Sequence, residues 1–145
     1  MLDNFNISAS ALTAQRLRMD VISENIANVN TTRTENGEPY RRKMPVFKEK
    51  AASFNDILVS KMETSNSSLN GVEVSEIAED DSPFKMKYEP EHPDANEEGY
   101  VAMPNVNVTT EMVDMISASR AYEANVTALN TAKDMAQQAL QIGQG

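Results

Sequence analysis

The strongest constraint on this chain is a seven-residue repeat of apolar side chains near each end. The N-terminal repeat has two rows, Phe5, Leu12, Met19 and Ile26, and, three residues on, Ile22 and Val29. The C-terminal repeat has the rows Met112, Ser119, Val126, Lys133 and Leu140, and, three residues on, Met115, Tyr122, Leu129 and Ala136. Such a repeat places a narrow apolar stripe along a helix, which is the geometry of a coiled coil. The pattern alone fits an ordinary helical bundle and a polymer-forming coiled coil equally well.

The first of these helices has clear start and stop signals. Asp3 or Asn4 can cap its N-terminus, because both side chains accept hydrogen bonds from free backbone N–H groups. We expect it to continue to about Val29, where several Asn and Thr side chains compete with the helix for backbone hydrogen bonds.

The second helix is predicted to be longer. Asn107, Thr109 or Thr110 can cap its start, and the sequence from there to Ile142 contains neither Gly nor Pro. Gly143 fits a C-terminal stop. The acidic Glu111 in its first turn is favoured by the positive end of the helix dipole.

The centre of the chain, residues 33–104, is predicted to be a small β-rich domain between the two helices. The pairs Asn36-Gly37 and Asn70-Gly71 are turn signals. Residues 84–88 alternate cleanly between apolar and charged side chains, as in a half-buried strand. Residues 50–62 have mixed helical character. We expect extended segments at 45–47, 72–77, 84–88 and 100–103. The fold class is therefore mainly α with a small β-rich insert.

The composition predicts a weak core and excludes several classes of protein. The 145 residues include no Trp, four Phe and four Tyr, so a monomer has few large side chains to bury and needs help from neighbours. A net charge of −9 opposes binding to nucleic acid or to anionic lipid. Without cysteine, the chain has no disulfides, zinc–thiolate sites or thiol nucleophiles.

No part of the sequence indicates catalysis or a cofactor. His92 lies in an acidic, proline-broken loop, but its spacing matches no metal motif, so a solvated loop is favoured over a metal site. The basic run Arg41–Lys43 is too short for a nucleic-acid site and is interpreted as a salt-bridged surface strip. The chain has no phosphate-binding glycine loop and no hydrolase motif. We therefore expect a protein that is not an enzyme.

Composition alone favours a cytosolic location. No apolar run approaches the roughly 20 residues that span a membrane. The first residues lack the basic stretch followed by an apolar one that is typical of a secretory signal peptide.

Four segments, in the same order, resemble a known family. Residues 10–32 resemble the N-terminal motif of bacterial flagellar rod and hook proteins, and residues 111–126 resemble its C-terminal partner motif. Residues 33–43 and 82–108 are similar to the proximal rod proteins of that family. Arg33-Thr34 stands where many relatives carry a Gly followed by an aromatic residue. The resemblance covers nearly the whole chain, and residues 50–69 are its least diagnostic part.

This resemblance implies a structural subunit. In that family, residues 1–32 and 105–145 would form a coiled-coil domain, and residues 33–104 an outer domain. Many copies would stack helically into the rod, the hollow drive shaft for motility, in contact with other rod proteins, the basal-body ring and the export gate. Export by the flagellar type III system would place the protein in the periplasm without a cleaved signal peptide. No cofactor, nucleic acid or membrane span is implied.

The resemblance and the heptads together predict an assembly interface. The two helices are expected to pack on each other and on neighbouring copies through Phe5, Leu12, Met19, Ile22, Ile26, Val29, Met112, Met115, Arg120, Tyr122, Val126, Leu129 and Leu140. Asn25, Asn28 and Asn30 are expected to bond to backbone groups where the chain leaves the first helix. A soluble coiled-coil adaptor or chaperone is the alternative, and it would be a discrete dimer or tetramer.

Overall fold

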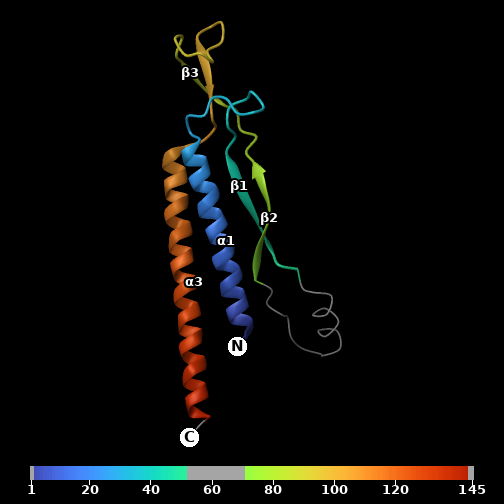
Figure 1. Ribbon diagram of the computed structural model, residues 1–145, viewed down its shortest axis with the longest axis vertical. Coiled ribbons are helices and arrows are strands. Elements are labelled where there is room, and N and C mark those ends of the chain that lie inside the picture. Colours follow the sequence, from blue (N-terminus) through green and yellow to red (C-terminus); the bar gives the residue numbers. More distant parts are fainter. Residues whose placement is uncertain (1, 52–70, 144–145) are drawn as a thin grey trace.

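Two long helices lie side by side and antiparallel, and they determine the shape of the molecule (Figure 1). The structure is a computed structural model that describes residues 2–51 and 71–143. Helix α1 spans Leu2–Ala27 and helix α3 spans Val108–Ile142. At ~1.5 Å per residue, α3 is about 14 Å longer than α1. The C-terminal end of α1 lies beside the N-terminal end of α3 (Figure 1). Neither described helix has an apolar stretch long enough to cross a membrane.

The helix ends follow from local side-chain hydrogen bonds. Asn107 caps α3, its side chain accepting from the N–H groups of Thr109 and Thr110. This cap is one of the three predicted ones. Helix α1 ends at Ala27, slightly before the predicted position, because the next turn tightens: the Val29 N–H donates to the carbonyl of Ile26.

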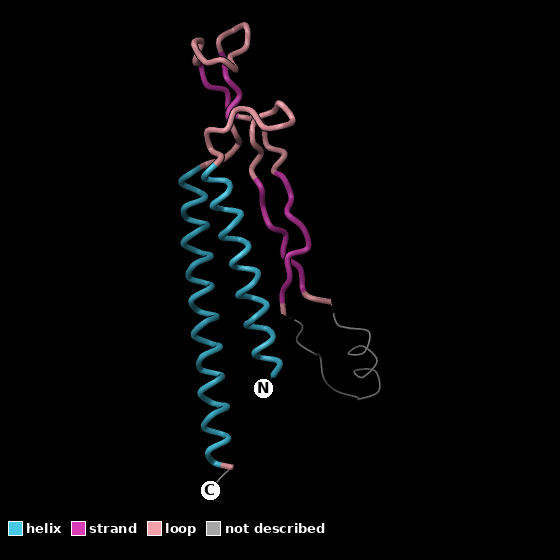
Figure 2. The backbone as a smooth tube through the Cα atoms, viewed as in Figure 1, coloured by secondary structure: helices cyan, strands magenta, loops and turns pink. Residues whose placement is uncertain are grey.

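The insert forms two separate antiparallel hairpins (Figure 2). Strand β1 (Lys43–Glu49) pairs with β2 (Val72–Glu79), with a bulge between Val46 and Phe47. Strand β3 (Lys85–Tyr88) pairs with β4 (Tyr100–Met103). All four predicted extended segments are therefore strands. Most of the 50–62 segment, for which we predicted mixed helical character, lies outside the described residues.

The prediction of a half-buried strand at 84–88 is wrong. All four residues of β3 are exposed, including Met86 and Tyr88. The alternating pattern was real, but the face that carries Met86 and Tyr88 has no layer packed on it, since this hairpin projects beyond the ends of the helices (Figure 1).

The core is thin, and α1 is packed between α3 and the β1–β2 hairpin. The buried apolar side chains of the core are Ala14, Val21, Ile22, Tyr40, Val101, Val106, Ala118 and Ala132. Three of these are alanines, which bury little area but let helices approach closely. Among the described residues, the largest fully buried side chain is that of Glu111, which is not apolar.

Candidate functional site

The buried residues of α3 are spaced by multiples of seven, and their row lies one residue before the first predicted row. Glu111, Ala118 and Ala132 are buried, and Met115, which lies between the first two, is half-buried. By contrast, Met112 at the head of the predicted row is 56% exposed. Single-sequence reasoning preferred Met112 to Glu111 because a carboxylate is rarely chosen for an interior position.

The predicted interface residues divide into two groups. Ile22 is buried, and Phe5, Leu12, Met19, Ile26, Val29, Met115, Tyr122, Val126 and Leu129 are half-buried. Met112, Arg120 and Leu140 are exposed. The monomer therefore shields the first group from water, completely or in part, and leaves the three exposed residues open to solvent or to a partner.

Exposed apolar side chains concentrate on α3. They occur at both of its ends, where Met112, Val113 and Ile116 are 53–61% exposed and Leu140 and Ile142 are 69% and 81% exposed. The outward positions of α1 are instead polar, such as Arg16, Asp20 and Ser23. A helix with apolar groups outside its own seam is typical of an element that packs on more than one neighbour.

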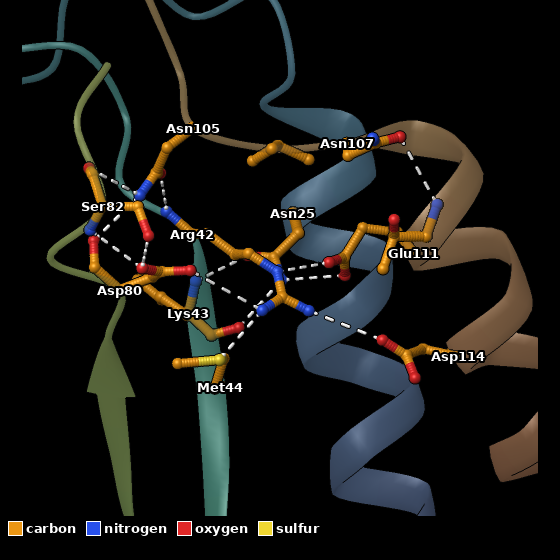
Figure 3. Close-up of polar contacts among 12 residues, drawn as sticks. Asn25, Arg42, Lys43, Met44, Asp80, Ser82, Asn105, Asn107, Glu111 and Asp114 are labelled. Atoms are coloured by element: carbon orange, nitrogen blue, oxygen red, sulfur yellow. Dashed lines mark hydrogen bonds and ion pairs between the residues drawn. The ribbon is translucent and has the colours of Figure 1, made fainter. Parts of the chain in front are cut away.

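The second distinctive feature is a polar junction, where α1 ends, α3 begins and the first hairpin starts (Figure 3). At its centre the carboxylate of Glu111 is 0% exposed. Its Oε1 accepts from Arg42 Nε at 2.6 Å, and its Oε2 accepts from Asn25 Nδ2 at 3.0 Å. A buried carboxylate is tolerated only when paired and hydrogen-bonded in this way.

Asn25 connects α1 to the backbone of the hairpin. Its Nδ2 donates to the Lys43 carbonyl at 2.8 Å, and its Oδ1 accepts from the Lys43 N–H at 2.9 Å. The Tyr40 hydroxyl donates to the same oxygen at 3.0 Å. Together with the bond to Glu111, these contacts use both donors and both lone pairs of the amide. Burial, and then the nearby carboxylates of Glu24, Glu111 and Glu79, raise the pKa of Tyr40 to about 12.

Arg42 extends the junction outward to Asp80, the residue after β2, and to the second turn of α3. Its guanidinium lies 3.5 Å from Asp114 Oδ2 and 3.7 Å from Asp80 Oδ2. Asp114 also pairs with Arg18 of α1 at 3.2 Å. Hydrogen bonds from Ser82, and more weakly the charge of Arg42, lower the pKa of Asp80.

A backbone contact completes the attachment of the hairpin. The Arg42 N–H donates to Asn105 Oδ1 at 2.8 Å, and Asn105 Nδ2 donates to the carbonyls of Asp80 and Ser82. Four segments that are far apart in the sequence are thereby fixed to each other. The junction sets the direction in which the hairpin leaves the helices.

This arrangement changes the interpretation of two sequence features. Arg42 is not part of a surface strip, because its side chain is only 20% exposed and holds a buried partner. The run is salt-bridged, as predicted, with Lys43 on Glu24 at 2.6 Å. Reasoning from sequence missed Arg42 and Glu111 as a pair, and the one available signal was that Glu111 lies seven residues before Ala118, in line with the seam.

The three asparagines of the predicted exit turn have different surroundings. Asn25 binds the hairpin as described. Asn28 Nδ2 donates to the carbonyl of Glu24 at 2.9 Å, within the last turn of the helix, and its Oδ1 accepts from Thr31 at 3.1 Å. Asn30 is exposed.

The loop around His92 does not gather metal ligands. His92 Nδ1 accepts from the Asp94 N–H at 3.1 Å, so that nitrogen is engaged within the loop. Across residues 2–51 and 71–143, no group of three or more His, Asp or Glu side chains is placed to hold a metal ion.

Comparison with known families places both helices in the same group of proteins. A family model described as "Flagella basal body rod protein" matches residues 5–33. A second, described as "Flagellar basal body rod FlgEFG protein C-terminal", matches residues 97–142. The two matches cover α1 with the exit turn, and β4 with α3.

Several relatives that share one name match this chain over nearly their full length. The chain is 57% identical to the "Flagellar basal-body rod protein FlgC" of Bacillus subtilis, over 97% of this chain and 96% of that one. It is 48% identical to that of Borreliella burgdorferi over 100% and 99% of the two chains, and 42% identical to that of Escherichia coli over 99% and 98%. The chain therefore belongs to the FlgC family of flagellar basal-body rod proteins.

Proposed function

We propose that the chain is a structural subunit of the flagellar basal-body rod, which polymerises helically through coiled-coil packing of its terminal helices to form the proximal part of a hollow drive shaft. The relatives' name supports the rod assignment. The observation that carries the mode of assembly is the row of exposed apolar side chains on α3, since a helix that served only its own fold would not keep Leu140 and Ile142 in water.

The division of labour along the chain is part of this proposal. Residues 1–32 and 105–145 form the packing domain, and residues 33–104 form the outer domain. The assembly interface comprises the thirteen predicted residues from Phe5 to Leu140, with Asn25, Asn28 and Asn30 shaping the exit turn. The half-buried members gain cover from neighbouring copies, and the exposed members contact them directly.

The partners and the location follow from the family. Its partners are copies of itself, other rod proteins, and components of the basal-body ring and the export gate. It works in the periplasmic part of the basal body after export by the flagellar type III system, and it has no catalytic activity. The adaptor alternative is not favoured, because the relatives are named as rod proteins.

The test is complementation in a bacterium that lacks its own rod protein of this family. The unmodified chain should restore motility in soft agar and rods in purified basal bodies. A Leu140→Asp variant should fail in both, because burying an unpaired carboxylate in the polymer costs several kcal/mol. The neighbouring Gln141→Asp variant, also exposed, is the matched control and should restore both.

Circular dichroism of the purified monomers separates assembly from folding. Both variants should unfold at the same temperature as the unmodified chain, since neither side chain belongs to the monomer core. If the unmodified chain built no rods, or purified as a discrete dimer at every concentration, the proposal would be wrong.

A further inference from the structure

The outer face of the second hairpin is an exposed apolar surface. Met86, Tyr88 and Tyr100 are 57%, 63% and 39% exposed. Tyr88 and Tyr100 are direct cross-strand partners, and Met86 lies two residues before Tyr88, so all three side chains share one face of the sheet. The two tyrosine rings meet edge to face with centroids 5.3 Å apart, which gives this face a defined shape.

This face is bordered by negative charge. The loop between the strands, residues 89–99, contains five acidic residues and no Lys or Arg. Two of the five are paired, Glu89 with Lys87 at 2.6 Å and Asp94 with Arg33 at 3.9 Å. Glu91, Glu97 and Glu98 are exposed and form no ion pair with the described part of the chain. A protein surface complementary to this hairpin is therefore apolar and carries a cation at its edge.

Within the described part of the chain, α3 carries a surface with these properties. On the outward face of α3, Met112, Val113 and Ile116 are 56%, 61% and 53% exposed. Ile116 follows Met112 by four residues and Val113 by three, so its side chain adjoins both of them on the helix surface and joins the three into one patch. Arg120, four residues after Ile116 and also exposed, places a guanidinium at the edge of the patch.

We propose that the outer face of the β3–β4 hairpin of one copy docks on this patch of α3 in a second copy, with Arg120 facing the acidic loop. The inference rests on the proposed function and names one of its contacts. Within one chain both surfaces remain exposed, so they do not cover each other. The contact joins two different surfaces, so it repeats from copy to copy and builds an open assembly rather than a closed dimer.

Charge makes the second copy the occupant and fixes its orientation. Two copies that each carry −9 repel in most orientations. The proposed contact instead places an arginine against the loop that carries the exposed Glu91, Glu97 and Glu98, and it aligns two apolar faces. Each patch is smaller than a standard interface, so one contact is weak and becomes effective only when many copies repeat it.

The experiment uses the fact that the chain has no cysteine. Differently tagged Tyr88→Cys and Ile116→Cys variants are co-expressed in the bacterium that lacks its own rod protein, and basal bodies are purified and oxidised. We expect a disulfide between the two tags. The matched control pairs Tyr88→Cys with Ser23→Cys, because Ser23 is exposed on the polar side of α1, and it should give none. An equal yield from both pairs would overturn the proposal.

A charge-reversal series decides the question if the cysteine variants build no rods. Arg120→Glu should reduce the number of rods per cell, in line with an about fivefold weaker contact between copies. Adding Glu97→Lys and Glu98→Lys to the Arg120→Glu chain should restore the number of rods per cell. Failure of this rescue overturns the contact. Because the unmodified chain is scored in parallel, absence of rods there identifies failure of the proposed function instead.

Discussion

Within residues 2–51 and 71–143, the Glu111 carboxylate has no access to water, and Arg42 is the one cation paired with it. In an Arg42→Met variant the apolar stem is kept and the guanidinium is lost. Glu111 would keep its bond from Asn25 at 3.0 Å and would lose its 2.6 Å bond from Arg42. The carboxylate would then be buried without a counter-charge, which is the expensive arrangement for an ionised group.

The magnitude follows from the geometry. Removing one partner of a buried pair costs about 3–5 kcal/mol. The Arg42 contacts to Asp80 and Asp114 are longer and partly exposed, so each adds less than about 1 kcal/mol. We expect the free energy of unfolding to fall by about 3–5 kcal/mol, a large part of the 5–15 kcal/mol typical of a domain.

The assay is urea unfolding at neutral pH, followed by far-UV circular dichroism. The matched control is Arg41→Met. The Arg41 guanidinium lies 3.4 Å from the Asp80 carbonyl oxygen and 4.4 Å from the centre of the Phe84 ring, and it forms no ion pair with the described residues, so its loss should cost about 1 kcal/mol or less. An Arg42→Met/Glu111→Leu double variant should recover part of the loss, because no unpaired charge remains. Equal losses for Arg41 and Arg42, or a double variant no better than Arg42→Met, would refute this reasoning.

Two further predictions concern the pH dependence and the second hairpin. Because the folded state holds the Tyr40 phenol proton to a pKa of about 12 instead of 10.0, the free energy of unfolding should be undiminished below pH 10 and fall as the pH rises from about 10 towards 12. Across this pH range the free energy of unfolding of a Tyr40→Phe variant should fall less than that of the unmodified chain. An equal fall in both would contradict the raised pKa of Tyr40. Gly99 has φ +81°, and an added Cβ would lie 2.9 Å from a Tyr88 ring carbon, so Gly99→Ala should raise hydrogen exchange in β3 and β4 by destabilising the hairpin about 1–2 kcal/mol. Gly143→Ala, with negative φ and no contact under 3.6 Å, should leave exchange unchanged, and equal effects would contradict the argument.

The sequence predicted the helices and strands well because their signals are local. An uninterrupted run after the Asn107 cap, and Asn-Gly pairs between alternating segments, depend only on neighbouring residues. The burial of β3 was mispredicted because alternation indicates two different faces and does not show whether a second layer covers one of them.

The polar junction was beyond the reach of sequence patterns. Asn25 and Glu111 are 86 residues apart, and Arg42 contacts Glu111 across 69 residues. Whether an Arg in a basic run is a solvated cation or the partner of a buried carboxylate depends on how α1, α3 and the hairpin pack together. Family resemblance did indicate the assignment, because four motifs in order carry information that a single heptad lacks.

The amide of Asn25 has a consequence for how this family can vary in length. By bonding to both the N–H and the carbonyl of Lys43, it holds the chain at residue 43 directly against the helix. These bonds hold together the two ends of the connection, residues 28–42. The exposed turn of this connection at Gly37 has open space around it. Residues inserted at that turn would lengthen the loop outward at little entropic cost, while the hairpin kept its register and direction. The molecule can thus vary its outer surface there without altering the frame on which it is built.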